Sequence, residues 1–320
     1  MEKNAKIYIA GHNGMVGSAI HRNLKSKGYT NFVFTPYPDY DLTDQSTVRE
    51  FFLLEKPDYV IDAAAKVGGI LANNSYRAQF IYENLMIQNN LIHNAYLNKV
   101  KKFLFLGSSC IYPRDCAQPM KEEYLLSGAL EPTNEPYAIA KIAGIKMCEN
   151  YYRQYGCNYI SLMPTNLYGP RDNFDLKTSH VIPALIRKFH EAKQLKAPNV
   201  QIWGSGKPKR EFLFVEDMAD ACVFIMENVE ADDIYSKGIT HLNIGSGTDI
   251  TINELAEAIK SVTRYEGYII YDKQKPDGVE RKLLEISRLT EIGWKCSTDL
   301  VTGLAIAYEW YENHSNEFHV

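Results

Sequence analysis

A tyrosine and a lysine four residues apart, Tyr137 and Lys141, are the residues of this chain whose types and spacing best indicate chemistry. Positions i and i+4 of a helix share one face, so the two side chains should lie close together. A phenol with a pKa of ~10 donates a proton poorly at neutral pH, and a neighbouring ammonium improves it by stabilising the phenolate. Such a pair suits hydride delivery to a carbonyl carbon whose oxygen then takes up a proton.

Ser108 supports this interpretation because it comes just after the apolar run KFLFL at residues 102–106. A hydroxyl at the end of a strand can hold the substrate oxygen that the tyrosine protonates. Alone, a Tyr–Lys pair at helical spacing is common on protein surfaces, which is the alternative interpretation. With Ser108 and a glycine loop upstream, the pattern predicts nicotinamide-dependent chemistry with Ser108, Tyr137 and Lys141 as catalytic residues.

The glycine loop at residues 11–17 reads GHNGMVG and lies between a β-rich run at 6–10 and a helical pattern at 15–27. Glycines allow a tight turn and let a pyrophosphate approach the N-terminus of the helix, where free N–H groups favour an anion. The spacing is GxxGxxG rather than GxGxxG, and a turn without a ligand is the alternative. We predict that the loop binds a dinucleotide through these residues: Gly11, Asn13, Gly14, Met15, Val16 and Gly17.

The end of the second predicted strand, at residues 34–37 (FTPY), has no side chain that selects a cofactor. An acidic residue there would select NAD, and an arginine would accept the 2′-phosphate of NADP. Asp41 and Leu42, on the following loop, are predicted to contact the adenine ring. This segment therefore leaves the choice between NADP and NAD open.

Strand-like runs alternate with amphipathic helical patterns through the first half of the chain. We predict strands at 6–10, 31–34, 59–63, 102–106 and 159–163, and helices at 15–27, 47–54, 80–98 and 137–155. Alternation of this kind indicates βαβ units, and hence an α/β fold with a doubly wound parallel Rossmann sheet. Farther on, the pattern predicts helices at 181–192, 218–227 and 251–259, and strands at 212–215 and 268–271.

The change of character after residue 164 indicates two domains. Residues 1–170 plus 212–244 are predicted to form the dinucleotide-binding domain. Residues 171–211 plus 245–320 are predicted to form a smaller α/β C-terminal substrate domain. The cleft between two such domains is the expected binding site.

Composition excludes several classes of partner. The net charge of −4, from 35 basic and 39 acidic residues, offers no basic surface for nucleic acid. No run approaches the ~18 apolar residues of a membrane span, and the N-terminus lacks a signal-peptide pattern. The six cysteines form no CxxC pair, so we expect reduced thiols in a cytoplasmic protein and no metal site.

The combination of GxxGxxG, a strand-end serine and YxxxK resembles the extended short-chain dehydrogenase/reductases. Within these, long runs are similar to the GDP-L-fucose synthase family, the GDP-4-keto-6-deoxymannose 3,5-epimerase-4-reductases. The runs are residues 9–17, 63–74, 106–113, 131–146, 163–170, 179–192 and 275–284. They cover nearly the whole chain and are more specific than a glycine loop alone.

This resemblance implies NADPH as cofactor, a GDP-4-keto-sugar as substrate and a homodimer formed through two long helices of each subunit. Cys110 and His180 match the base and the acid that exchange protons at C3 and C5. Matches to cofactor contacts are Leu106, Gly107, Lys141, Pro164, Asn166, Leu167 and His180. Matches to substrate contacts are Ser108, Lys188, Trp203, Arg210 and Asp277.

Chemistry supports the role of Cys110 separately. A 4-keto group acidifies the protons at C3 and C5, so a thiolate and a general acid on opposite faces could invert both centres before reduction. Cys110 lies two residues after Ser108, near the carbonyl that this serine would hold. The alternatives are a packed loop thiol at Cys110 and a helix cap at His180.

Two departures from the family keep other functions open. Arginines that the family carries in the glycine loop and after the second strand are replaced by Asn13 and by residues 35–37, and the loops at 114–128 and 171–178 also differ. A 4-reductase that acts on a GDP-4-keto-heptose without epimerisation is therefore an alternative. A redox-neutral NAD-dependent epimerase or dehydratase is another, although Ser109 and Cys110 stand where a dehydratase would carry an Asp–Glu pair. A nucleotide-sensing regulator is disfavoured because Ser108, Tyr137 and Lys141 are all present.

Overall fold

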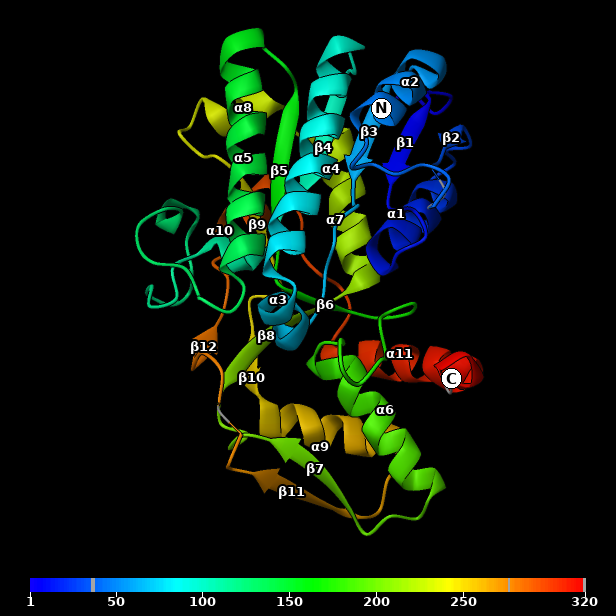
Figure 1. Ribbon diagram of the computed structural model, residues 1–320, viewed down its shortest axis with the longest axis vertical. Coiled ribbons are helices and arrows are strands. Elements are labelled where there is room, and N and C mark those ends of the chain that lie inside the picture. Colours follow the sequence, from blue (N-terminus) through cyan, green and yellow to red (C-terminus); the bar gives the residue numbers. More distant parts are fainter. Residues whose placement is uncertain (36–37, 276, 319–320) are drawn as a thin grey trace.

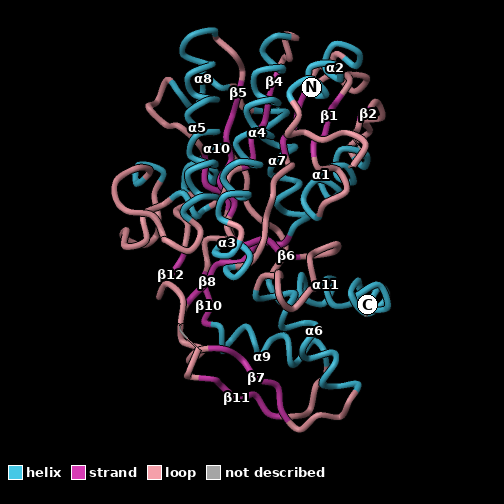
Figure 2. The backbone as a smooth tube through the Cα atoms, viewed as in Figure 1, coloured by secondary structure: helices cyan, strands magenta, loops and turns pink. Residues whose placement is uncertain are grey.

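The computed structural model describes residues 1–35, 38–275 and 277–318, so Pro36 and Tyr37, part of the segment considered for cofactor selection, lie outside the described residues. At its centre is a six-stranded parallel sheet in the order β2-β1-β3-β4-β5-β9 (Figures 1 and 2). The strands are β1 (Ile7–Ala10), β2 (Phe32–Val33), β3 (Tyr59–Asp62), β4 (Lys102–Leu106), β5 (Tyr159–Pro164) and β9 (Leu242–Ile244). Strand β2 is added on one side of β1, and β3 and the later strands are added on the other side. Sheets of this kind bind ligands at the carboxyl ends of the strands where this change occurs, here between β1 and β3.

Helices cover both faces of this sheet (Figure 1). The helices are α1 (Met15–Ser26) and α7 (Val215–Asn228) on one face, and α2 (Gln45–Glu55), α4 (Arg77–Leu97) and α5 (Glu135–Tyr155) on the other. In β1, Ile7 and Ile9 belong to one apolar cluster, and Tyr8 and Ala10 belong to the other. Both faces are therefore buried, and the predicted doubly wound fold is confirmed.

A second group of elements lies beyond the carboxyl ends of the strands, in the lower half of Figure 1. It contains β6 (Asn166–Tyr168), β7 (Asn199–Trp203), β8 (Lys209–Phe214), β10 (Asp249–Thr251), β11 (Tyr268–Asp272) and β12 (Arg281–Lys282). Strand β8 pairs with β6 and β12 in parallel and with β10 antiparallel, while β7 pairs with β11. A third apolar cluster is buried among α6 (Val181–Gln194), α9 (Ile252–Thr263) and α11 (Leu300–His314).

Several short elements complete the fold. They are α3 (Ile70–Ser75), α8 (Ala231–Tyr235), α10 (Ser287–Ile292) and the 3₁₀ turns η1 (Ser109–Ile111), η2 (Glu122–Tyr124) and η3 (Ser315–Phe318). We did not predict α3, β6 or β7, because such short runs show too little periodicity. Helix α7 begins at Val215 rather than at 218, since β8 runs directly into it. Among the described helices, none has the length and apolar character needed to cross a membrane.

Lys102, the first residue of β4, is a lysine with only 2% of its surface exposed. Its Nζ donates hydrogen bonds to the carbonyl oxygens of Ile225 at 2.9 Å, Met226 at 3.0 Å and Val229. Carbonyl groups at the end of a buried helix are costly when they have no donor. This ammonium therefore ties β4 to the C-terminal end of α7.

We expect Lys102→Met to lower the free energy of unfolding by about 2–4 kcal/mol, because these carbonyl groups lose their donor. Urea unfolding followed by circular dichroism measures the change. Lys101→Met is the matched control: Lys101 is exposed and pairs with Glu2 and Asp58, so its loss should cost less than about 1 kcal/mol. Equal stability of Lys102→Met and the wild type would contradict the assigned role.

Candidate active site

The glycine loop has the shape of a pyrophosphate cradle. Gly11 has a φ angle of 76°, and a Cβ there would lie 2.7 Å from the carbonyl oxygen of Ala63. A Cβ on Gly17 would collide with the carbonyl group of Gly11. Glycine at 17 therefore lets α1 approach the loop after β1, and glycine at 11 lets that loop approach the end of β3. Gly14 is the N-cap of α1, and the N–H groups of residues 15–17 have no partner within the helix. These residues fit the pyrophosphate of a dinucleotide.

The loop after β2 is held against α4. Asn90 Nδ2 donates to the carbonyl oxygens of Leu42 at 3.0 Å and Thr43 at 3.2 Å. The exposed carboxylate of Asp41 closes its own turn, because its Oδ1 accepts from the backbone N–H and the hydroxyl of Thr43 at 2.9 and 2.8 Å. Asn13 is exposed in the glycine loop. Contacts of Asn13, Asp41 and Leu42 with a cofactor stay predictions.

Tyr137 and Lys141 lie one turn apart on α5 at the carboxyl end of β4. Lys141 is 3% exposed, its Nζ donates to the carbonyl oxygen of Leu106 at 2.9 Å, and it lies 5.8 Å from the centre of the Tyr137 ring. Burial lowers the pKa of Lys141, against the charges of Asp62 and Cys110. Burial and the same two charges raise the pKa of Tyr137. Tyr137 is therefore a protonated phenol at neutral pH, in position to donate its proton.

Ser108 and Cys110 begin the loop that follows β4. The backbone N–H of Cys110 donates to Ser108 Oγ at 3.4 Å, so the hydroxyl and the thiol lie near each other. Burial raises the pKa of Cys110, whereas the hydrogen bond to Ser108 and the charges of Lys282 and Lys141 lower it. Lys282 lies on β12, paired in register with Arg210 of β8. The electrostatic surroundings of the thiol are therefore drawn from both halves of the molecule.

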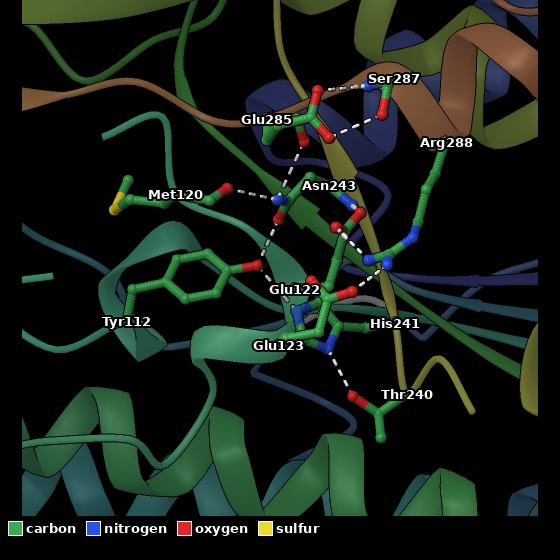
Figure 3. Close-up of polar contacts among 10 residues, drawn as sticks. All are labelled: Tyr112, Met120, Glu122, Glu123, Thr240, His241, Asn243, Glu285, Ser287 and Arg288. Atoms are coloured by element: carbon green, nitrogen blue, oxygen red, sulfur yellow. Dashed lines mark hydrogen bonds and ion pairs between the residues drawn. The ribbon is translucent and has the colours of Figure 1, made fainter. Parts of the chain in front are cut away.

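A buried polar network holds the chain that follows η1 (Figure 3). The Tyr112 hydroxyl lies 2.8 Å from His241 Nε2 and donates to Asn243 Oδ1. Glu122 accepts from the Asn243 backbone N–H at 3.2 Å and from Arg288 of α10 at 2.6 Å. Burial lowers the pKa of His241 to about 3, so this imidazole is neutral at physiological pH. The network attaches the thiol-bearing loop to β9 and α10.

The carboxyl ends of β4 and β5 form the edge predicted to meet the nicotinamide. Gly107 packs so closely against Met163 that a Cβ would collide with it. After β5, Asn166 Nδ2 donates to the carbonyl oxygen of Glu211 at 2.9 Å, which fixes the start of β6 on β8. Five predicted cofactor contacts lie at or just after these strand ends: Leu106, Gly107, Pro164, Asn166 and Leu167.

His180 occupies the N-cap position of α6, with an exposed side chain that makes no capping hydrogen bond. Its alternative role as a helix-capping side chain is therefore not what the structure shows. The segment before it touches the loop after β3, where the Gly69 N–H donates to the carbonyl oxygen of Thr178 at 2.8 Å. The same loop packs near Phe80, whose ring meets Tyr137 edge-on with centroids 6.3 Å apart. One loop thus connects the His180 segment with the surroundings of Tyr137.

Four residues predicted to bind substrate gather near the ends of β7 and β8. Trp203 is 58% exposed, and Lys188 Nζ lies 5.5 Å from its ring centre. Lys275, which we did not predict, lies 5.3 Å from the same ring. Asp277 accepts hydrogen bonds at 2.8 and 2.6 Å from the serine two residues after Trp203, and its charge interacts with that of Arg210. An exposed indole flanked by cations suits an aromatic base carrying phosphates.

Besides Lys275, two charged residues at the site, Lys282 and Asp62, were not found from the sequence. Lys282 belongs to a run that carries the family resemblance, but no spacing sets it apart from other lysines. Asp62 ends β3 and is buried, and a single aspartate at the end of an apolar strand gives no pattern to detect. In residues 1–35, 38–275 and 277–318, no group of three or more His, Cys, Asp or Glu side chains is placed to hold a metal ion.

Comparison with known proteins identifies a family model and several relatives that match this chain. Residues 7–245 match the model of the NAD dependent epimerase/dehydratase family. GDP-L-fucose synthase of Escherichia coli K12 is 53% identical over 317 residues, which cover 98% of this chain and 98% of that protein. GDP-L-fucose synthase 1 of Arabidopsis thaliana is 56% identical over 310 residues, which cover 97% of this chain and 94% of that protein.

Solved structures agree with this placement. A GDP-D-glycero-L-gluco-heptose synthase of Campylobacter jejuni, in the presence of NADPH, is 41% identical with a TM-score of 0.92, covering 98% of this chain and 99% of that one. The fold, the site and nearly full-length identity above one half all point to one group. The chain belongs to the GDP-L-fucose synthases of the NAD dependent epimerase/dehydratase family.

Proposed function

We propose that this protein is an NADP-dependent oxidoreductase that acts on a GDP-4-keto-sugar. It exchanges the protons at C3 and C5 and then reduces the C4 keto group with NADPH, as in GDP-L-fucose synthesis. The observation that carries the proposal is the placement of the Cys110 thiol beside Tyr137 and Lys141 at one edge of the sheet. The names of relatives that are 53% and 56% identical support the substrate class.

NADPH, when bound, supplies the hydride. The glycine loop and the N-terminus of α1 would hold its pyrophosphate, and the ends of β4 and β5 would meet its nicotinamide. The Lys141 ammonium donates one N–H to the carbonyl oxygen of Leu106, which leaves its other N–H groups free to bind the nicotinamide ribose. The C. jejuni structure obtained with NADPH supports NADP over NAD. NAD stays the alternative, because the described residues just after β2 (34, 35 and 38–41) include no arginine that could accept the 2′-phosphate.

Proton exchange at C3 and C5 would use Cys110 as base and His180 as acid. Removing either proton gives an enolate, whose oxygen the Ser108 hydroxyl can hold. The thiolate is the reactive form of a cysteine. Burial disfavours that form here, while the charges of Lys282 and Lys141 favour it. Part of the His180 side chain is exposed, so it can recover a proton from solvent between the two inversions, while desolvation of the ring lowers its pKa.

Reduction then needs a proton donor for the oxygen at C4. Tyr137 would give its phenolic proton to the alkoxide formed by hydride transfer, and Lys141 would stabilise the resulting phenolate. Ser108 would hold the same oxygen in place. Beyond the reacting centre, Trp203, Arg210 and Asp277 would contact the nucleotide sugar, and Lys188 would lie near the diphosphate.

A second candidate is a 4-reductase without epimerase activity that acts on a GDP-4-keto-heptose in bacterial surface-polysaccharide synthesis. The name of the C. jejuni heptose synthase, 41% identical, favours it. The loop at 171–178, which differs from the fucose-synthase pattern, directly precedes His180. The choice between a hexose and a heptose would therefore depend on this loop.

We also propose that two copies associate through α4 and α5. Large apolar side chains are exposed on these helices: Tyr82 (60%), Leu97 (53%), Ile139 (41%) and Tyr155 (47%).

The division into residues 1–170 plus 212–244 and residues 171–211 plus 245–320 would assign the cofactor to one domain and the GDP-sugar to the other. Six free cysteines favour a reducing compartment such as the cytoplasm.

Proton exchange tests the first proposal directly. Incubated with GDP-4-keto-6-deoxymannose in deuterated water, the wild type should place deuterium at C3 and C5. Cys110→Ala should slow this exchange by about 100-fold or more, because the base is gone, and should still oxidise NADPH. Mass spectrometry of the sugar gives the rates, and Cys157→Ala, a half-buried thiol at the far end of α5, is the control.

Wild-type exchange rates in Cys110→Ala would show that another group is the base. Oxidation of NADPH by the wild type without any deuterium uptake would reject epimerisation. If a GDP-4-keto-heptose were then the better substrate, the second candidate would be selected.

For the reduction step, we expect Tyr137→Phe to lower kcat by about 10²–10⁴-fold, because the alkoxide loses its proton donor. Deuterium uptake and NADPH binding should persist, which separates this loss from misfolding. Tyr151→Phe on the same helix removes a hydroxyl that lies 2.7 Å from His93 Nδ1 and should keep wild-type kcat. A Tyr137→Phe enzyme that retains more than about a tenth of the activity would exclude Tyr137 as the donor.

A further inference from the structure

Asp62 is a buried carboxylate to which the chemistry above gives no role. It is the last residue of β3 and 1% exposed. In the sheet it is paired with Ala10 of β1 and Phe105 of β4, which both belong to the apolar cluster beneath α4 and α5. Paired residues of neighbouring strands project to the same face, so Asp62 points towards α5.

Lys141 reaches the same place from α5. Its Nζ lies 4.8 Å from the centre of the Phe105 ring and 2.9 Å from the carbonyl oxygen of Leu106. Phe105 of β4 is the register partner of Asp62 of β3. The ammonium therefore lies over β4, the strand adjacent to the one that carries the carboxylate. Asp62 Oδ1 accepts from the Ala64 N–H at 3.1 Å, while the buried Oδ2 has no hydrogen-bond partner among the described residues. Such an oxygen needs a compensating charge.

Four titratable groups among the described residues face Asp62, and of these Lys141 is the one that carries a positive charge. The others are Tyr8 of β1 and, on α5, Tyr137 and Cys148. Burial raises the pKa of both tyrosines and raises the pKa of Cys148 to about 12, so all three are neutral at physiological pH. Asp62 and Lys141 are therefore the oppositely charged groups of this pocket, and they interact through their charges without direct contact.

We propose that Asp62 is a positioning residue of the reductase site, whose carboxylate keeps the Lys141 ammonium charged and next to Tyr137. The proposal rests on the reductase function proposed above. The proposal explains why Asp62 Oδ2 is buried without a hydrogen-bond donor among the described residues: the charge that compensates the carboxylate is that of Lys141 on α5. It also gives Lys141 the positive charge that stabilises a Tyr137 phenolate after proton transfer.

The arrangement has a definite consequence for pH dependence. Burial raises the pKa of Asp62 to about 6, against the charge of Lys141 and the Ala64 N–H, so the carboxylate is ionised at neutral and alkaline pH. Its charge raises the pKa of both Lys141 and Tyr137. Reduction needs both groups protonated and is lost as the pH rises through their pKa values. Without the carboxylate, both pKa values fall and the loss occurs at lower pH.

Asp62→Asn removes the charge and keeps the shape. We expect the alkaline limb of kcat for NADPH-dependent reduction to move to lower pH by about one unit, with each KM changed by less than about threefold. Cys148→Ala, a neutral change in the same pocket, is the matched control and should keep the wild-type limb. An unmoved limb in Asp62→Asn, or a uniform loss of kcat at every pH, would overturn the proposal.

A second measurement requires neither turnover nor an Asp62 variant. With ¹³C-labelled aspartate side chains, the Asp172 carboxyl, whose pKa burial raises to about 7 without a lysine near it among the described residues, serves as an internal control. The Asp62 carboxyl of the wild type should titrate with a pKa of about 6. Lys141→Met should raise that pKa by about one unit or more, because the compensating cation is removed. This readout is independent of the substrate, so it stands even if the reductase function fails. If no aspartate carboxyl responds to Lys141→Met, the assignment of Asp62 is wrong even in an active enzyme.

Discussion

An ammonium buried between a helix and a parallel sheet is the constraint on which this site depends. Lys141 is almost fully enclosed, and a charge removed from water needs nearby compensation. A carbonyl oxygen from the end of β4 and a carboxylate from the end of β3 provide it. These two strands are neighbours only because the chain crosses over the sheet in helical connections. The strand order thus determines whether the lysine beneath Tyr137 can stay charged.

The thiol of Cys110 has the opposite requirement. Burial favours its neutral form, so a reactive thiolate depends on positive charges brought near it. One comes from Lys141 on α5, and the other comes from Lys282 on β12, in the second group of elements. Because Lys282 is paired in register with Arg210, one pair of strands brings cations both to the Cys110 thiol and to the cluster around Trp203. The thiol and that cluster therefore share structural support.

Two features hold the backbone of the site in place. Glycine at position 17 lets α1 approach the loop after β1, and glycine at position 11 lets that loop approach the end of β3, where any Cβ would collide. Behind the thiol-bearing loop, a neutral His241 and the ion pair of Glu122 with Arg288 satisfy buried polar atoms without leaving an uncompensated charge. The loop at 171–178 contains no strand or helix.

Local patterns in the sequence determined much of this protein. Alternating apolar runs predicted the parallel sheet, the glycine loop predicted the cofactor cradle, and helical spacing placed Tyr137 beside Lys141, because each pattern repeats over a few residues. Tertiary structure alone decided the environment of these groups. Asp62 and Lys282 come from strands distant from α5 in the chain, and no spacing rule links them to it. Burial and charge pairing depend on such distant neighbours, so they became visible only when the sheet order and the strand register were known.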